Sequence, residues 1–145
     1  MKIANLEASK ALKRGDYPAG CVIIREGKIL SRSSSMNITK NDSTVHAEIN
    51  AIKKACKKLR SRHLDDCILY SNIEPCLMCA QAIIYARIKK VVYGTEHKEY
   101  GDKKTFDILK ENGIGKDINV TRGICEKEAK TLLAKFLKKI SFKAF

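Results

Sequence analysis

The sequence contains no tryptophan, and aromatic residues make up only 6% of it. Flat aromatic surfaces on which unpaired bases could stack are therefore scarce. No apolar stretch approaches the ~20 residues that a membrane-spanning helix needs. Residues 1–7 carry an early acid and no long apolar run, so they do not have the pattern of a signal peptide. We therefore expect a cytoplasmic protein that has no association with a membrane.

Acidic residues are also few. The sequence has 16 Asp and Glu and 29 Lys and Arg, which gives a formal net charge of +13. The basic residues gather in two parts of the chain. The first group is Lys53, Lys54, Lys57, Lys58, Arg60 and Arg62, and the second is Lys127, Lys130, Lys135, Lys138, Lys139 and Lys143. Two interpretations stay open: solvated helix faces, or a surface that binds nucleic acid.

The six cysteines do not indicate a disulfide framework, because such frameworks are rare in the cytoplasm. Four of them stand alone within apolar patterns, and we expect them to pack as small apolar side chains. These four are Cys21, Cys56, Cys67 and Cys125. Cys76 and Cys79 lie three positions apart and differ from the rest.

The order of expected elements predicts the fold class. The chain of 145 residues is 44% hydrophobic and has no repeat or linker, which fits a single domain over residues 1–145. After a first helix closed by Gly15, a hairpin turns at Glu26-Gly27, and strands then alternate with helices. The expected helices cover residues 1–14, 46–59, 76–87, 105–111 and 125–140. The expected strands cover residues 21–25, 28–31, 67–70, 91–93 and 118–121. A polar loop is expected over residues 32–45, and Gly94 is expected to end the fourth strand. Alternation requires crossover connections, so we predict a three-layer α/β/α fold. Its five-stranded sheet is mixed because the opening hairpin is antiparallel, and helices cover both faces.

The segment 76–87 is apolar on nearly every side of the expected helix. A helix of this kind is either buried or part of an interface between chains. In a chain this small, part of it is hard to cover without a partner, which favours an oligomer.

Two short motifs carry the chemistry. His46-Ala47-Glu48 opens one helix after a polar loop, and Pro75-Cys-Leu-Met-Cys79 opens the next helix after a strand. Residues three apart on a helix are neighbours, so Cys76 and Cys79 can hold one metal ion, with His46 as the third ligand. Thiolate and imidazole ligands together select zinc. Three protein ligands leave a position for water, which is the pattern of a catalytic zinc, one per chain.

Glu48 is suited to a different role. It follows His46 by two positions, or about 200° around a helix, and is therefore a poor second ligand from the same helix. It can stand beside the water on the metal and move its protons. We therefore expect Glu48 to be the catalytic residue.

Two other interpretations of the cysteine pair fit the sequence less well. A redox pair of the thioredoxin kind also follows a strand, but it leaves His46 and Glu48 unexplained. A structural zinc site would need a fourth protein ligand. The spare histidines are His63 and His97, and each lies in a charged loop.

The H-x-E and P-C-x-x-C pattern resembles the signature of zinc-dependent nucleobase deaminases. The chain resembles the cytidine deaminase superfamily over nearly its whole length. Its nearest likeness is to the branch that holds tRNA adenosine deaminases, guanine deaminases and fungal-type cytosine deaminases. Residues 65–70 and 74–76, with Ala86-Arg87 and Glu96-His97, look like guanine deaminase, whereas residues 86–94 and 118–124 look like the tRNA enzymes. The resemblance implies zinc, hydrolytic replacement of a C–NH2 group by C=O, and a homodimer.

The pocket departs from this branch at two places. The branch has an Asn in the loop before the zinc His, where it binds the base, and an alignment without gaps puts Ser35 there. Asn37 could serve only if the loop is shorter by two residues. Residues 95–105, which in the branch help to enclose the substrate, match neither enzyme. The resemblance also places Ala47 and Pro75 at the substrate.

These departures favour a free base or nucleoside, such as guanine, adenine or cytosine, as the substrate. An alternative is a tRNA-specific adenosine-to-inosine deaminase, which the basic charge favours. A third hypothesis, a non-catalytic zinc subunit that binds RNA, is disfavoured because Glu48 is intact.

Overall fold

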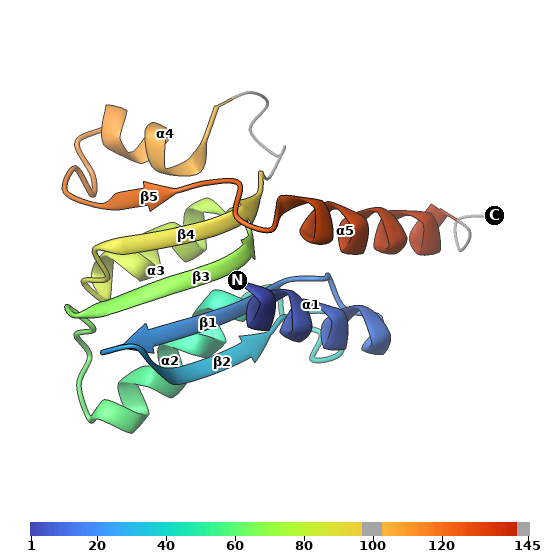
Figure 1. The fold of residues 1–145 in the computed structure, drawn as a ribbon, viewed down its shortest axis with the longest axis horizontal. Coiled ribbons are helices and arrows are strands. Elements are labelled where there is room, and N and C mark those ends of the chain that lie inside the picture. The colour runs from blue at the N-terminus through green and yellow to red at the C-terminus, as the bar shows by residue number, and fades with distance from the viewer. Residues whose placement is uncertain (97–102, 142–145) are drawn as a thin grey trace.

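A computed structural model describes residues 1–96 and 103–141. Five strands form one sheet in the order β2-β1-β3-β4-β5 (Figure 1). The strands are β1 (Gly20–Arg25), β2 (Lys28–Ser34), β3 (Cys67–Ile73), β4 (Lys90–Thr95) and β5 (Asn119–Thr121). Strand β1 is antiparallel to both of its neighbours, and β3, β4 and β5 are mutually parallel. The mixed sheet with an opening hairpin is confirmed.

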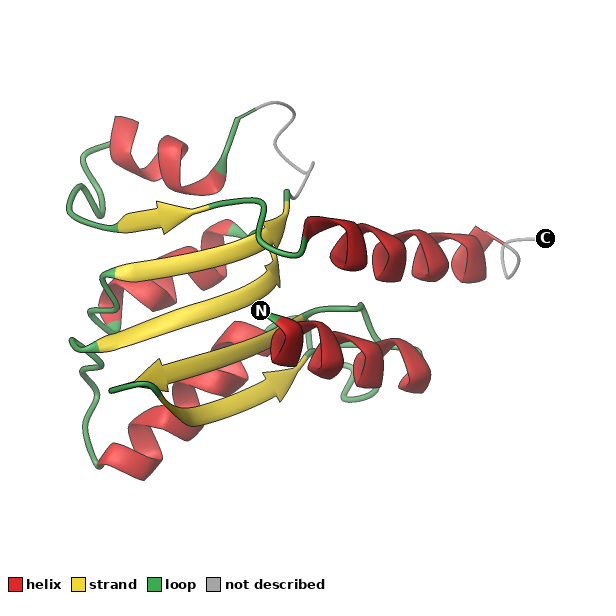
Figure 2. Cartoon of the chain, in the orientation of Figure 1, coloured by secondary structure: helices red, strands yellow, loops and turns green. Residues whose placement is uncertain are grey.

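Helices cover both faces of the sheet, as predicted. They are α1 (Lys2–Arg14), α2 (Ala47–Leu59), α3 (Leu77–Tyr85), α4 (Thr105–Glu111) and α5 (Glu126–Ser141). Helices α1 and α5 lie on one face and α2 and α3 on the other, while α4 lies beyond the β5 edge (Figures 1 and 2). Within the two described ranges, no helix has both the length and the apolar character needed to cross a bilayer.

Two strands run further than their apolar segments indicate. Strand β2 continues to Ser34 and β3 to Ile73, because their polar residues are buried and hydrogen-bonded instead of forming loops. Strand β4 also passes through Gly94, where we expected it to end. A Cβ at Gly94 would lie 2.6 Å from the carbonyl oxygen of Asn72, so the glycine permits a close approach and does not mark a turn.

The main apolar core lies between the sheet and helices α2 and α3. Ile23, Leu69 and Val91 contribute from three adjacent strands, and each is almost fully buried. Helix α2 presents a face of alanines to this core, which lets it lie close to the sheet. The packing brings the N-termini of α2 and α3 together at the end of the sheet where β3 finishes.

Candidate active site

The two sequence motifs meet at these helix N-termini. His46 is the residue before α2, and Cys76 is the residue before α3. Nδ1 of His46 lies 3.6 Å from Sγ of Cys76 and 3.5 Å from Sγ of Cys79. The three donor atoms all lie within 4.8 Å of one another. Residues 30 positions apart in sequence thus form one cluster, as their spacing predicted.

The cluster fits a zinc ion. With Zn–S bonds of about 2.3 Å and a Zn–N bond of about 2.05 Å, tetrahedral geometry separates nitrogen from sulfur by roughly 3.6 Å. The two observed separations agree with this value. Among the described residues this is the single group of three such donors, so His63 is not a fourth ligand. His63 lines a separate pocket with Leu59 and Cys67, and His97 lies outside the described residues.

The cysteine pair supplies an ionised sulfur. The hydrogen bond between the two cysteine side chains lowers the pKa of Cys76 to about 4. Burial opposes this shift, and the hydrogen bond with His46 adds to it. The hydrogen bond between the two cysteines, together with burial, raises the pKa of Cys79. Thiolates are the form of cysteine that binds metals. The site is therefore prepared for a cation.

Glu48 lies beside the three donors and is not one of them. It belongs to the first turn of α2, and only 4% of its surface is exposed. Its Oε1 accepts a hydrogen bond of 3.0 Å from Ser71, and its Oε2 lies 3.5 Å from Sγ of Cys79. Burial raises the pKa of Glu48 above its usual range. A carboxyl group with a raised pKa, next to a metal site, is suited to acid–base work at neutral pH.

A pocket of about 160 Å³ opens onto Glu48, His46 and Cys76. Its other lining residues are Tyr17, Ala19, Ser35, Asn37, Ile73 and Glu74. The two alternatives for the branch's Asn, Ser35 and Asn37, thus both line it. Ala47 and Pro75 are buried and their side chains do not line the pocket, because α2 turns Ala47 toward the core.

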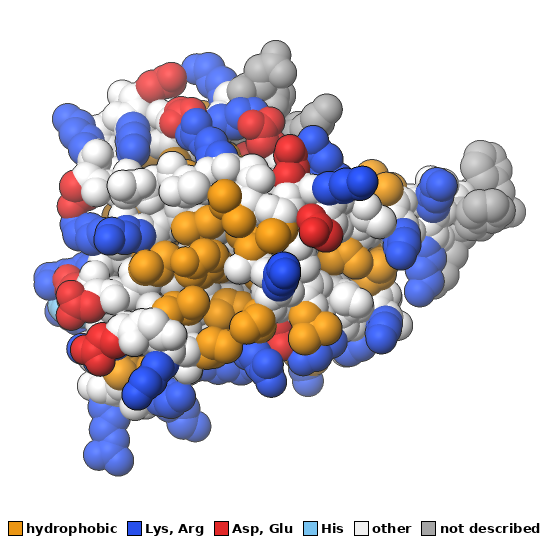
Figure 3. Space-filling view, in the orientation of Figure 1, with side chains coloured by type: hydrophobic (Ala, Val, Ile, Leu, Met, Phe, Trp, Pro, Cys, Tyr) orange, Lys and Arg blue, Asp and Glu red, His pale blue; other side chains and the backbone are white. Residues whose placement is uncertain are grey.

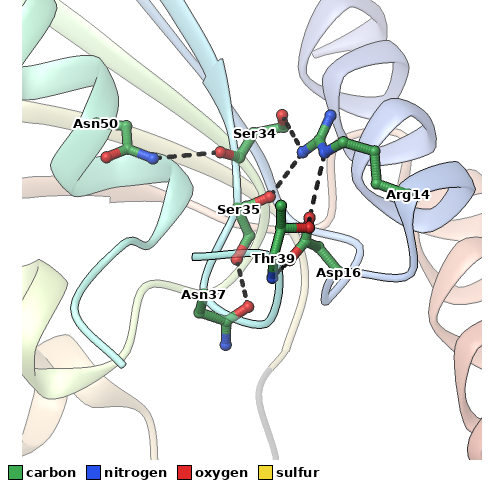
Figure 4. Close-up of polar contacts among 7 residues, drawn as sticks. All are labelled: Arg14, Asp16, Ser34, Ser35, Asn37, Thr39 and Asn50. Atoms are coloured by element: carbon green, nitrogen blue, oxygen red, sulfur yellow. Dashed lines mark hydrogen bonds and ion pairs between the residues drawn. The ribbon is translucent and has the colours of Figure 1, made fainter. Parts of the chain in front are cut away.

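The loop after β2 is anchored from the C-terminal end of α1 (Figure 4). Nη2 of Arg14 donates hydrogen bonds to Oγ of Ser34 and to the carbonyl oxygen of Ser35, at 2.9 and 2.8 Å. The fully buried Asp16 accepts bonds of 2.8 and 2.7 Å from N and Oγ1 of Thr39. These contacts fix both ends of the segment that carries Asn37.

Asn72 holds the segment that leads into β1, which forms another part of the pocket wall. Its Oδ1 accepts a 2.7 Å bond from the backbone of Gly20, and its Nδ2 donates a 2.9 Å bond to the carbonyl oxygen of Pro18. Gly20 is required here, because a Cβ would lie 2.1 Å from the carbonyl oxygen of Ala4. Ala19, between the two held residues, lines the pocket. Residues 18–20 therefore form part of the pocket wall through Ala19.

Sequence reasoning missed several residues of the site. The ring of Tyr17 packs edge-on against Phe136 of α5, with centroids 5.4 Å apart. Glu74 accepts a 2.8 Å bond from the backbone of Thr105 and also lines the pocket. Ser71 was not singled out. A polar residue within an apolar strand was the available signal for Ser71, whereas the Tyr17–Phe136 contact joins distant parts of the chain and left no local signal.

Together, the α/β/α fold, a three-donor zinc site and a buried carboxyl group beside it define a zinc-dependent hydrolytic deaminase. The chain belongs to the cytidine and deoxycytidylate deaminase family, whose zinc-binding region matches residues 1–95.

Its relatives act on more than one kind of substrate. The chain is 37% identical to the tRNA-specific adenosine deaminase of Aquifex aeolicus over 141 residues, which cover 97% of this chain and 93% of that protein. It is 50% identical to the guanine deaminase of Bacillus subtilis over 82 residues, 57% of this chain and 53% of the enzyme. A solved structure of a tRNA:A34 deaminase, from work on A-to-I editing at the wobble position of transfer RNA, superposes with a TM-score of 0.85. It is 34% identical, and the match covers 92% of this chain and 97% of the other.

Proposed function

We propose that the chain deaminates adenosine in a tRNA. The observation that carries this proposal is the likeness to tRNA adenosine deaminases over 97% of the chain. The net charge of +13 suits a polyanionic substrate. The sequence favoured a free base because the pocket departs from the branch at Ser35 and over residues 95–105. The position of Asn37 in the pocket weakens the first of these objections, and residues 97–102 of the second lie outside the described residues.

The charge on one face of the molecule suits a broad electrostatic contact better than a single stripe. On the face that carries α1 and α5, Lys and Arg side chains lie around the periphery, interspersed with acidic ones, while apolar side chains gather over the strands (Figure 3). Positive charge spread in this way attracts a polyanion without reading its sequence. The base that enters the pocket would then be selected by the pocket itself.

A second candidate is the deamination of free guanine. It is favoured by the 50% identity to guanine deaminase, which exceeds the identity to the tRNA enzyme but covers only 57% of the chain. A pocket of about 160 Å³ is small for a ligand site, which suits a single base in either case.

We propose the following roles for the site residues. His46, Cys76 and Cys79 hold one zinc ion per chain, which when bound activates water and stabilises developing negative charge. Glu48 accepts a proton from the attacking water and delivers it to the ring nitrogen next to the amino-bearing carbon. It then passes the second proton to the amine. The C–N bond breaks, so that C–NH2 and H2O become C=O and NH3.

We also propose a homodimer in the cytoplasm. Helix α3 leaves Tyr85 79% exposed and Met78 38% exposed, which is unusual for large apolar side chains on one short helix. The six cysteines, all within the described ranges, carry free thiols, as is usual in a reducing compartment.

One experiment separates the two substrates. Ammonia release is measured for a tRNA anticodon stem-loop that contains adenosine, and for adenine, guanine, cytosine and their nucleosides. The tRNA proposal predicts that the stem-loop has the highest kcat/KM and that the rate falls steeply with salt. Turnover of guanine with no turnover of the stem-loop would replace the first candidate by the second.

A further inference from the structure

Ser71 lies at the centre of the sheet, under the catalytic site. It is in register with Cys21 of β1 and Tyr93 of β4, and none of its surface is exposed. A buried hydroxyl group is costly unless it makes a hydrogen bond. Ser71 makes that bond to the carboxyl group of Glu48, at 3.0 Å.

The bond makes the two oxygens of Glu48 different. Oε1 is held by the Ser71 hydroxyl, whereas Oε2 lies on the side of Cys79, 3.5 Å from its sulfur. Oε2 is therefore the oxygen that contacts one of the metal donors. We propose that Ser71 is a positioning residue that fixes the Glu48 carboxylate with Oε2 toward the water to be activated. This inference depends on the role of Glu48 proposed above.

The carboxylate needs such a partner because the last torsion of a Glu side chain is broadly distributed. Nothing in the chemistry of the side chain itself selects one oxygen for the reaction. Small misplacements of a catalytic group lower rates strongly, and hydrogen bonds to charged groups are among the stronger ones. Losing the Ser71 hydroxyl should therefore reduce turnover without loss of metal or substrate binding.

A merely structural role makes a different prediction. If Ser71 served only to stabilise β3, its removal would lower stability and would affect every variant of the enzyme equally. If it acts through Glu48, its effect on turnover disappears when Glu48 can no longer accept a proton. A double-mutant cycle distinguishes the two.

The test uses Ser71→Ala, alone and combined with Glu48→Gln, in the full-length protein. A matched control is Ser31→Ala, which removes another buried hydroxyl, one that donates a 2.8 Å bond to the carbonyl oxygen of Ala51. Zinc content, thermal unfolding, KM and kcat are measured for each, with ammonia release as the assay. Ser71→Thr, which keeps the hydroxyl, is the rescue variant.

Ser71→Ala should keep one zinc per chain and a KM within about twofold, while kcat falls about 10–100-fold. Ser71→Thr should recover most of that loss, and Ser31→Ala should leave kcat within about twofold. In the Glu48→Gln background, Ser71→Ala should change residual turnover by less than about twofold. An unchanged kcat in Ser71→Ala, or an equal fall in both backgrounds, would overturn the positioning role. Full turnover in Glu48→Gln alone would instead overturn the proposed mechanism.

Discussion

Ser35 donates a hydrogen bond of 3.0 Å from its hydroxyl group to Oδ1 of Asn37, and both residues line the pocket beside the zinc site. The bond occupies the amide oxygen and leaves the NH2 group of Asn37 as the available donor (Figure 4). We therefore expect the two alternatives for the base-binding position to act together.

Asn37→Ala should raise KM by about tenfold or more, because an acceptor atom on the bound nucleobase then lacks the hydrogen bond from the Asn37 NH2 group. Ser35→Ala should have a smaller effect of the same kind, since it only frees the amide to rotate. Steady-state kinetics and zinc content check both. Asn50→Ala is the control, because the amide of Asn50 contacts the carbonyl oxygen of Ser34 and does not line the pocket. A KM in Asn37→Ala equal to that of the control would refute the assignment.

The zinc site predicts a specific loss of metal. Purified protein should contain about one zinc per chain, and Cys76→Ala or Cys79→Ala should remove it, because two ligands do not hold the ion tightly. Cys56→Ala serves as the control, since this half-buried cysteine lies near the C-terminal end of α2 and is not one of the three donors, so its loss should leave the metal in place. Metal analysis by emission spectroscopy is the measurement. Full occupancy in the Cys76/Cys79 double variant is the contradicting result.

Asp16 should make stability depend on pH. Burial alone would raise the pKa of Asp16, but the hydrogen bonds from Thr39 and Arg14 outweigh burial and hold it below the usual 3.8. A lowered folded-state pKa stabilises the protein above pH 3.8, and this contribution is lost as the pH falls through the folded-state value.

Asp16→Asn should therefore lower the free energy of unfolding at pH 7 by about 1–3 kcal/mol. The difference from the unsubstituted protein should shrink below pH 3.8. Urea unfolding at several pH values measures it. A difference that is constant from pH 7 to pH 3 would show that the charge of Asp16 is not what matters.

The dimer proposal rests on helix α3. Light scattering at tens of micromolar protein should give the mass of two chains, and Tyr85→Asp should give one, because it places a charge in the apolar contact. Leu6→Asp is a matched control: Leu6 is 54% exposed but lies on α1, at the other face of the sheet. A monomeric unsubstituted protein, or dissociation by both substitutions alike, would count against an interface at α3.

The sequence predicted what depends on local spacing. The positions of Cys76 and Cys79 relative to one helix start, and of His46 and Glu48 relative to another, were enough to predict the zinc site. The element order and the mixed sheet followed from the alternation of strands and helices. The motifs and periodicities used for these predictions each lie within about one turn or one strand of the chain, although the cluster that they form joins residues 30 positions apart.

The remainder depends on tertiary contacts. Ser71 and Asn72 looked like the end of a strand because they are polar, yet the structure buries both and uses them to hold Glu48 and Gly20. Tyr17 lines the pocket, and its ring packs against Phe136 from a distant part of the chain. That both Ser35 and Asn37 line the pocket depends on the path of a loop, which no spacing rule determines.

The proposed role of Glu48 is to move protons without holding the metal. Glu48→Gln preserves the size of the side chain but cannot accept a proton. The variant should keep one zinc per chain and its affinity for substrate, while ammonia release falls by roughly 10²–10⁴-fold. Metal content and single-turnover rate, measured on the same preparation, test this most directly. Loss of zinc in proportion to activity, or turnover equal to that of the unsubstituted protein, would contradict the account.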